Sequence, residues 1–178
     1  YLGGLTAVGN IFYFQATDGT NGQELWKSDG TSAGTMMVKD INNGTGSSSL
    51  AQLTAVGNTL FFRANDGTNG TELWKSDGTA NGTVMVKDIY NGSTTWVEMC
   101  CHSEQNPGGS PVYVTSPNDS NPSHLIAFDN ALYFAANNGN NGIELWKSDG
   151  TANGTMMVQD IQFGYSSMTS DFGYSSSP

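Results

Sequence analysis

The sequence predicts an all-β protein made of three similar four-stranded units. One block of sequence occurs three times along the 178 residues. Within each block apolar and polar residues alternate with a period of two, and no helical period is present. The 23 glycines, together with many Asn, Ser and Thr residues, suit β-turns and disfavour long helices.

Two motifs recur in the same order in every unit. Leu-Thr-Ala-Val-Gly-Asn begins at Leu5 and Leu53, and a looser copy begins at Leu125. Glu-Leu-Trp-Lys-Ser-Asp-Gly-Thr begins at Glu24, Glu72 and Glu144. The first two units are 48 residues apart and the next two are 72 apart, so 24 additional residues interrupt the array.

Each unit is expected to contain four short strands. In the first unit they cover Leu5–Val8, Ile11–Ala16, Glu24–Ser28 and Thr35–Asp40. Turn sequences rich in Gly, Asn and Asp separate them, and the first of these is a Gly-Asn pair suited to a tight hairpin. In the third unit Asp-Asn replaces this pair.

The units are expected to stack, because one sheet cannot bury both of its faces. Alternation along the third strand puts Leu25 and Lys27 on one face and Trp26 on the other. The predicted packing residues are the leucine and tryptophan of each motif: Trp26, Trp74, Trp146, Leu25, Leu73 and Leu145.

The predicted organisation has five segments. They are repeat 1 (1–48), repeat 2 (49–96), an inserted linker (97–121), repeat 3 (122–162) and a Ser/Gly/Tyr-rich tail (163–178) that leads to the next unit or protomer. The insertion and its surroundings, from about Tyr90 to His124, contain four prolines and a short β-like run at Val112–Thr115. Insertions in repeat arrays often bind partners, so this segment is the expected contact arm.

The number of units predicts an incomplete array. Each unit has the size of one propeller blade, and closed propellers need about four to eight blades. Tyr1 lies four residues before the repeat-opening Leu5, and Pro178 is in phase with Pro122. We therefore expect an array whose two ends fall near the start of a repeat unit. It is either part of a longer chain or a protomer that continues head to tail as a ring or filament.

The motif Glu-Leu-Trp-x-x-Asp-Gly-Thr, followed by Gly-Thr and a Val-x-Asp-Ile strand, resembles the ELWxxDGT repeat of secreted and surface-attached bacterial proteins. The resemblance covers residues 5–41, 53–89 and 125–161. It implies a propeller-like array with an extracellular or cell-surface location. It carries over no catalytic residues, because this repeat is not defined by an activity.

Charge and hydropathy exclude two classes of partner. Sixteen acidic residues outnumber six basic ones, which gives a net charge of −10. Nucleic acid and anionic membrane surfaces would therefore repel the protein. No stretch of about 18 apolar residues exists, so membrane insertion is not expected.

We expect no enzymatic activity. The acidic residues recur in every unit, as Glu24 and Asp29 do, whereas a catalytic pair should be unique. Their expected role is to cap turns and hairpins. The sequence contains no Gly-x-Ser-x-Gly motif, and Arg63 is its only arginine, so a sialidase-like arginine cluster is absent.

No cofactor is predicted, although calcium is a weaker alternative. Asp18–Glu24 and its copy Asp66–Glu72 offer oxygen ligands at short spacing. The third copy has Asn138 in place of the aspartate, and no Asp-x-Asp-x-Asp-Gly loop occurs. A turn without metal is therefore favoured.

Two covalent modifications are considered. The adjacent Cys100 and Cys101 leave open a vicinal disulfide, bridges between chains, or buried thiols, and an extracellular location favours an oxidised form. Asn-x-Ser/Thr sequons occur at Asn43, Asn69, Asn81, Asn91, Asn118 and Asn153. They indicate either glycan attachment or ordinary turn chemistry.

These observations predict a non-catalytic extracellular structural protein. Its expected partner is itself, in a head-to-tail homo-oligomer such as a surface fibre or filament. The alternative is an adhesin or a carbohydrate-binding propeller segment of a longer secreted protein, in which case glycans are the partner.

Overall fold

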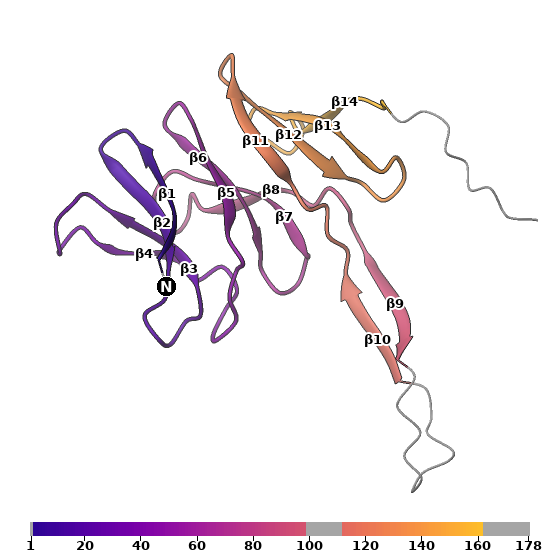
Figure 1. Ribbon diagram of the computed structural model, residues 1–178, viewed down its shortest axis with the longest axis horizontal. Coiled ribbons are helices and arrows are strands. Elements are labelled where there is room, and N and C mark those ends of the chain that lie inside the picture. Colours follow the sequence, from indigo (N-terminus) through magenta and orange to yellow (C-terminus); the bar gives the residue numbers. More distant parts are fainter. Residues whose placement is uncertain (1, 99–111, 162–178) are drawn as a thin grey trace, which may run out of the picture.

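The computed structural model describes residues 2–98 and 112–161, and this part of the chain is all-β, as predicted. Three sheets have four antiparallel strands in sequence order (Figure 1). The first contains β1 (Gly3–Val8), β2 (Ile11–Ala16), β3 (Glu24–Ser28) and β4 (Met36–Lys39). The second contains β5 (Ala51–Val56), β6 (Thr59–Asn65), β7 (Thr71–Ser76) and β8 (Val84–Lys87). The third contains β11 (Ser123–Phe128), β12 (Ala131–Asn137), β13 (Ile143–Ser148) and β14 (Met156–Gln159).

The observed strands of the first sheet agree closely with the prediction. β2 and β3 have the predicted bounds, and β4 is one residue shorter at each end. β1 begins two residues earlier than predicted because a bulge extends it, with Gly4 at φ 64°. The same bulge occurs in β5 and β11, where Gln52 (φ 60°) and His124 (φ 54°) adopt this left-handed conformation without being glycine.

The first hairpin turn has one residue with positive φ in the first two sheets and two such residues in the third. Gly9 and Gly57 have φ of 59° and 57°, while the asparagines that follow them do not adopt positive φ. In the third sheet both Asp129 (49°) and Asn130 (58°) do. Asp and Asn tolerate this region better than most residues, so the turn forms without glycine.

The second sheet lies between the other two, and the sheets spread apart from their first strands (Figure 1). β5 contacts β1 on one side and β11 on the other. Two apolar cores result, one between the first and second sheets and one between the second and third. No helix in the described residues is long and apolar enough to cross a membrane.

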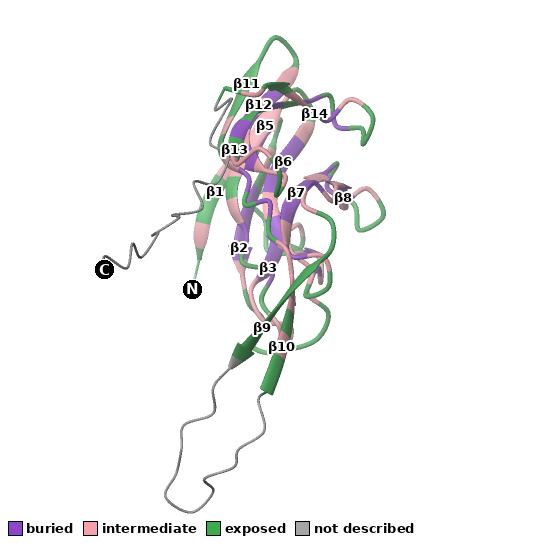
Figure 2. Ribbon diagram, turned by 90° about the vertical axis from the view of Figure 1, so that its right-hand side faces the viewer, coloured by how far each residue is buried: buried purple, intermediate pink, exposed green. Residues whose placement is uncertain are grey.

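The insertion forms a two-stranded antiparallel hairpin of β9 (Ser93–Glu98) and β10 (Val112–Pro117). It confirms the strand predicted at Val112–Thr115, and β9 begins inside the range assigned to repeat 2. The hairpin projects away from the three sheets and is mostly exposed (Figures 1 and 2). Trp96 and Tyr113 are among its exposed side chains.

Candidate functional site

The two contacts between sheets are built in the same way. We call the side of each sheet that carries Leu25, Leu73 or Leu145 its leucine face, and the side that carries Trp26, Trp74 or Trp146 its tryptophan face. Leu25 packs in one core with Trp74, and Leu73 packs in the other with Trp146. The leucine faces of the first and second sheets therefore cover the tryptophan faces of the second and third, which confirms the assignment of Leu25 and Trp26 to opposite faces.

A lysine on the last strand strengthens each junction. Lys39 Nζ donates to the carbonyl oxygen of Thr83 at 2.8 Å and lies 5.9 Å from the centroid of the Trp74 ring. Lys87 Nζ does the same to Thr155 at 2.9 Å, and it lies 5.9 Å from the Trp146 ring. Each lysine thus combines a charged hydrogen bond with a cation–π contact.

A second lysine contacts the turn of the next sheet. Lys27 Nζ donates to the carbonyl oxygen of Gly78 at 2.8 Å. Hydrogen bonds from Thr79 lower the pKa of Asp77, and the charge of Lys27 lowers it further. Hydrogen bonds from Thr151 likewise lower the pKa of Asp149 in the third sheet, and the charge of Lys75 lowers it further. Opposite charges therefore face each other across both junctions.

The motif aspartates hold their own turns together, which is the role predicted for them. Asp29 Oδ1 accepts hydrogen bonds from the backbone N–H and the hydroxyl of Thr31, at 2.9 and 2.7 Å. Asp77 and Asp149 make the same pair of bonds in their sheets. A Cβ atom at Gly34 would overlap the Asp29 carboxylate, which explains why glycine closes this turn.

The motif glutamates do not cap turns, so this part of the prediction is wrong. Glu72 is fully buried and accepts hydrogen bonds from Ile89 N (3.0 Å), Ser120 N (3.0 Å) and Ser120 Oγ (2.6 Å). Glu24 binds Ile41 N and Ser48 N in the same way, at 2.9 and 3.0 Å. Each carboxylate thus ties the end of its own sheet to the segment that leads into the next one.

This arrangement makes stability depend on pH. Burial raises the pKa of Glu72 to about 7, from an ordinary value of 4.5, against the opposing effect of its hydrogen bonds. Because folding favours the protonated acid, stability is greatest below pH 4.5 for this group and declines as pH rises through 7. We expect the free energy of unfolding to fall by up to about 3 kcal/mol across that range.

Urea denaturation at a series of pH values measures this effect. Glu72→Gln should flatten the decline between pH 4.5 and 7.5, leaving the smaller contribution of Glu24, whose pKa burial also raises. A stability that stays constant over this range in the unsubstituted protein would contradict the assignment. At lower pH the trend reverses, because Asp18, Asp29 and Asp77 have lowered pKa values and lose stabilising interactions on protonation.

The leucine face that the first two sheets bury is open on the third. Leu25 and Leu73 are 0% exposed, but Leu145 is 38% exposed. Val38 and Val86 are 7% and 6% exposed, whereas Val158 is 43% exposed. Phe128, which lies edge-on to Tyr133 at 5.9 Å between ring centroids, is also exposed.

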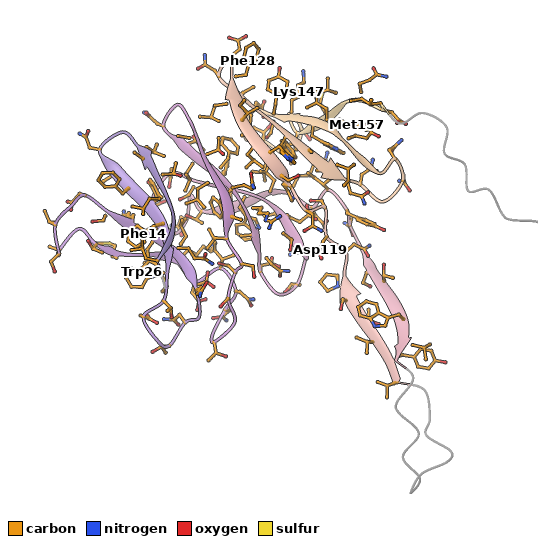
Figure 3. The ribbon with its side chains drawn as sticks, in the orientation of Figure 1. Phe14, Trp26, Asp119, Phe128, Lys147 and Met157 are labelled. Atoms are coloured by element: carbon orange, nitrogen blue, oxygen red, sulfur yellow. The ribbon has the colours of Figure 1, made fainter. Side chains whose placement is uncertain are left out.

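The first sheet carries the matching open tryptophan face. Trp26 is half-buried, while its counterparts Trp74 and Trp146 are 6% exposed. Phe12 is 46% exposed, while Leu60 at the same position of the second sheet is fully buried. Figure 3 shows Phe14 and Trp26 on the first sheet, at one end of the row of sheets, and Phe128 and Lys147 on the third, at the other end.

The structure does not assemble the alternative calcium site. Asp18 accepts hydrogen bonds from the N–H groups of Thr20 and Asn21 in its own turn. Glu24 instead binds the buried segment between the first and second sheets, at Ile41 N and Ser48 N. Among residues 2–98 and 112–161, no group of three or more His, Cys, Asp or Glu residues could hold a metal ion.

The predicted modification sites have different environments. Cys100 and Cys101 lie outside the described residues. Asn69 Nδ2 donates to Asp66 Oδ2 at 2.7 Å, and Asn118 Oδ1 accepts from Thr94 Oγ1 at 2.6 Å, so both side chains are engaged. The remaining sequon asparagines are exposed: Asn43, Asn81, Asn91 and Asn153. Glycan attachment at these four stays a prediction.

The junction lysines are functional residues that the sequence analysis missed. Lys27 and Lys75 belong to the repeated motif, and Lys39 and Lys87 occupy equal positions of the fourth strands. Lys147 is the third copy of the motif lysine, so five of the six basic residues in the chain stand at repeated positions, and this was a signal of a repeated contact.

A comparison with protein-family models finds no match, and comparisons with curated proteins and with solved structures find none either. The resemblance to the ELWxxDGT repeat therefore rests on the sequence motif alone.

Proposed function

We propose that this protein is a structural repeat protein that assembles with itself head to tail. The leucine face of the third sheet in one copy would cover the tryptophan face of the first sheet in the next. One observation carries the proposal: the two open faces are the two halves of a contact that the chain already makes twice.

The chemistry of the two faces supports this pairing. Leu145, Val158 and Phe128 offer an apolar surface of the kind that marks an interaction site. Their counterparts in the second sheet, Leu73, Val86 and the partly buried Val56, pack in one core with Trp146, so the surface of Trp26 has the matching composition. The contact is heterologous, and repeating it gives a closed ring or an open filament.

Charge also favours this orientation. Lys147 occupies the motif position of Lys27 and Lys75. The pair Asp29-Gly30 occupies the position of Asp77-Gly78, which Lys27 contacts. A head-to-tail contact would bring Lys147 to the turn of Asp29 in the next copy. The net charge of −10 makes copies repel each other at long range. The local attraction between Lys147 and Asp29 opposes this repulsion in one orientation only, so it helps to fix how two copies align.

The spread of the sheets supports a propeller-blade interpretation of each unit. Their first strands are neighbours, and the sheets diverge from them as blades diverge from an axis (Figure 1). Together with the resemblance to the ELWxxDGT repeat, this favours an extracellular or cell-surface scaffold without catalytic activity.

Sedimentation velocity over a range of concentrations, followed by electron microscopy, tests the proposal. The mean mass should rise with concentration above the 18.8 kDa of one chain, and rings or filaments should be visible. A protein that stays at 18.8 kDa at every concentration would contradict it. That result would favour the alternative, in which this chain is an adhesin or carbohydrate-binding segment whose open faces are covered by further repeats.

A further inference from the structure

The third sheet departs from the first two at the strand position that carries the junction lysine. Lys39 is paired with Leu25 and Lys87 with Leu73, and at the same place Gln159 is paired with Leu145. We propose that Gln159 makes the contact between two copies weaker than the contacts within one chain. This inference rests on the head-to-tail assembly proposed above and assigns residue 159 as the position that sets its strength.

The internal junctions show what a lysine contributes at this position. Lys39 and Lys87 each cross to the next sheet, reach a threonine carbonyl oxygen and lie over a tryptophan ring. Both lysines are half-buried in the process. Their ammonium groups therefore make these two contacts where water is partly excluded, which strengthens both.

Gln159 cannot reproduce this pair of contacts. Its side chain is neutral, so it cannot form the cation–π contact, and it is shorter than lysine. In the structure it is exposed, and its Nε2 donates to the carbonyl oxygen of the adjacent Asp160 at 3.2 Å. The groups that would face it in the next copy are the carbonyl oxygen of Thr35 and the ring of Trp26, which correspond to those of Thr83 and Trp74.

A second departure acts in the same direction. Thr6 Oγ1 donates across the first junction to Leu53 O at 3.1 Å, and Thr54 Oγ1 donates across the second to Leu125 O at 3.4 Å. The third sheet has Ile126 at this position, which has no hydroxyl group. The third sheet thus lacks the donors that correspond to Lys39 and Thr6, and it keeps Lys147 at the position of Lys27.

The assembly would therefore contain strong junctions within each chain and weaker junctions between chains. The apolar faces and Lys147 bring copies together in a fixed orientation, while the missing contacts make the junction between copies the first to open. Assemblies would then dissociate into intact three-sheet chains before any chain unfolds.

Restoring the lysine provides the test. We expect Gln159→Lys to lower the dissociation constant for self-association about tenfold or more, measured by sedimentation velocity. Gln159→Met, which keeps nearly the same side-chain length and adds no charge, should leave it nearly unchanged. Thr68→Lys places the same charge on an exposed turn of the second sheet, so it controls for the reduced net repulsion. The melting temperatures of dilute samples should be the same for all three variants.

The outcomes separate the two proposals. If the unsubstituted protein assembles and Gln159→Lys has no effect, or has only the effect of Thr68→Lys, the role of residue 159 is disproved and head-to-tail assembly survives. If neither the unsubstituted protein nor Gln159→Lys self-associates at any concentration, both are disproved. Self-association of the unsubstituted protein that becomes tighter specifically in Gln159→Lys supports the inference.

Discussion

Replacing Leu73 with alanine is expected to lower the free energy of unfolding by about 3–4 kcal/mol, because it leaves a cavity in the core between the second and third sheets. Leu73 is fully buried against the face of Trp146. Leu145 occupies the same motif position but is 38% exposed, so its replacement by alanine should cost less than about 1 kcal/mol in an unassembled chain.

Urea denaturation of dilute samples, followed by tryptophan fluorescence, compares these variants directly. Leu25→Ala is a second buried control, since Leu25 is also 0% exposed, and it should behave like Leu73→Ala. Equal losses at Leu73 and Leu145 would show that the third sheet buries its leucine face within one chain, against the structure described above.

Leu145→Asp is expected to weaken self-association by about a hundredfold or more, because it places an unpaired charge in the centre of the apolar contact. The fold should be retained, since the side chain is partly exposed in a single chain. Sedimentation velocity should find only single chains at concentrations at which the unsubstituted protein assembles.

Tyr113→Asp is the matched control for this prediction. Tyr113 is 67% exposed and lies on β10 of the projecting hairpin, outside the three sheets. It loses an apolar side chain and gains a charge, as Leu145→Asp does, yet it should not affect assembly through the sheet faces. If Tyr113→Asp abolished assembly and Leu145→Asp did not, the hairpin would be the contact surface, as the insertion was first predicted to be.

The local structure of each unit was predictable because it depends on nearby residues. The bounds of β2 and β3 follow from alternation between strong turn sequences, and the opposite faces of Leu25 and Trp26 follow from the strand period. The bulge at Gly4, Gln52 and His124 was not predictable, because three different residue types adopt the same left-handed backbone conformation there.

The candidate site depends on neighbours, and this limits what sequence can show. Trp26 and Trp74 have the same flanking residues, but only Trp74 is covered by another sheet. The role of Glu72 was missed for a similar reason, since its partner Ser120 lies 48 residues away, beyond the insertion. The sequence predicted an incomplete array, and the structure identifies the residues of its two open faces.

Mixing two blocked variants tests the central claim, that the leucine face of one copy binds the tryptophan face of another. Leu145→Asp blocks one face and Trp26→Asp blocks the other, so each variant alone should remain a single chain. An equimolar mixture should form dimers of one copy of each and nothing larger, because only one compatible pair of faces remains. Association of either variant with itself, or a mixture that stays monomeric at concentrations at which the unsubstituted protein assembles, would contradict the account.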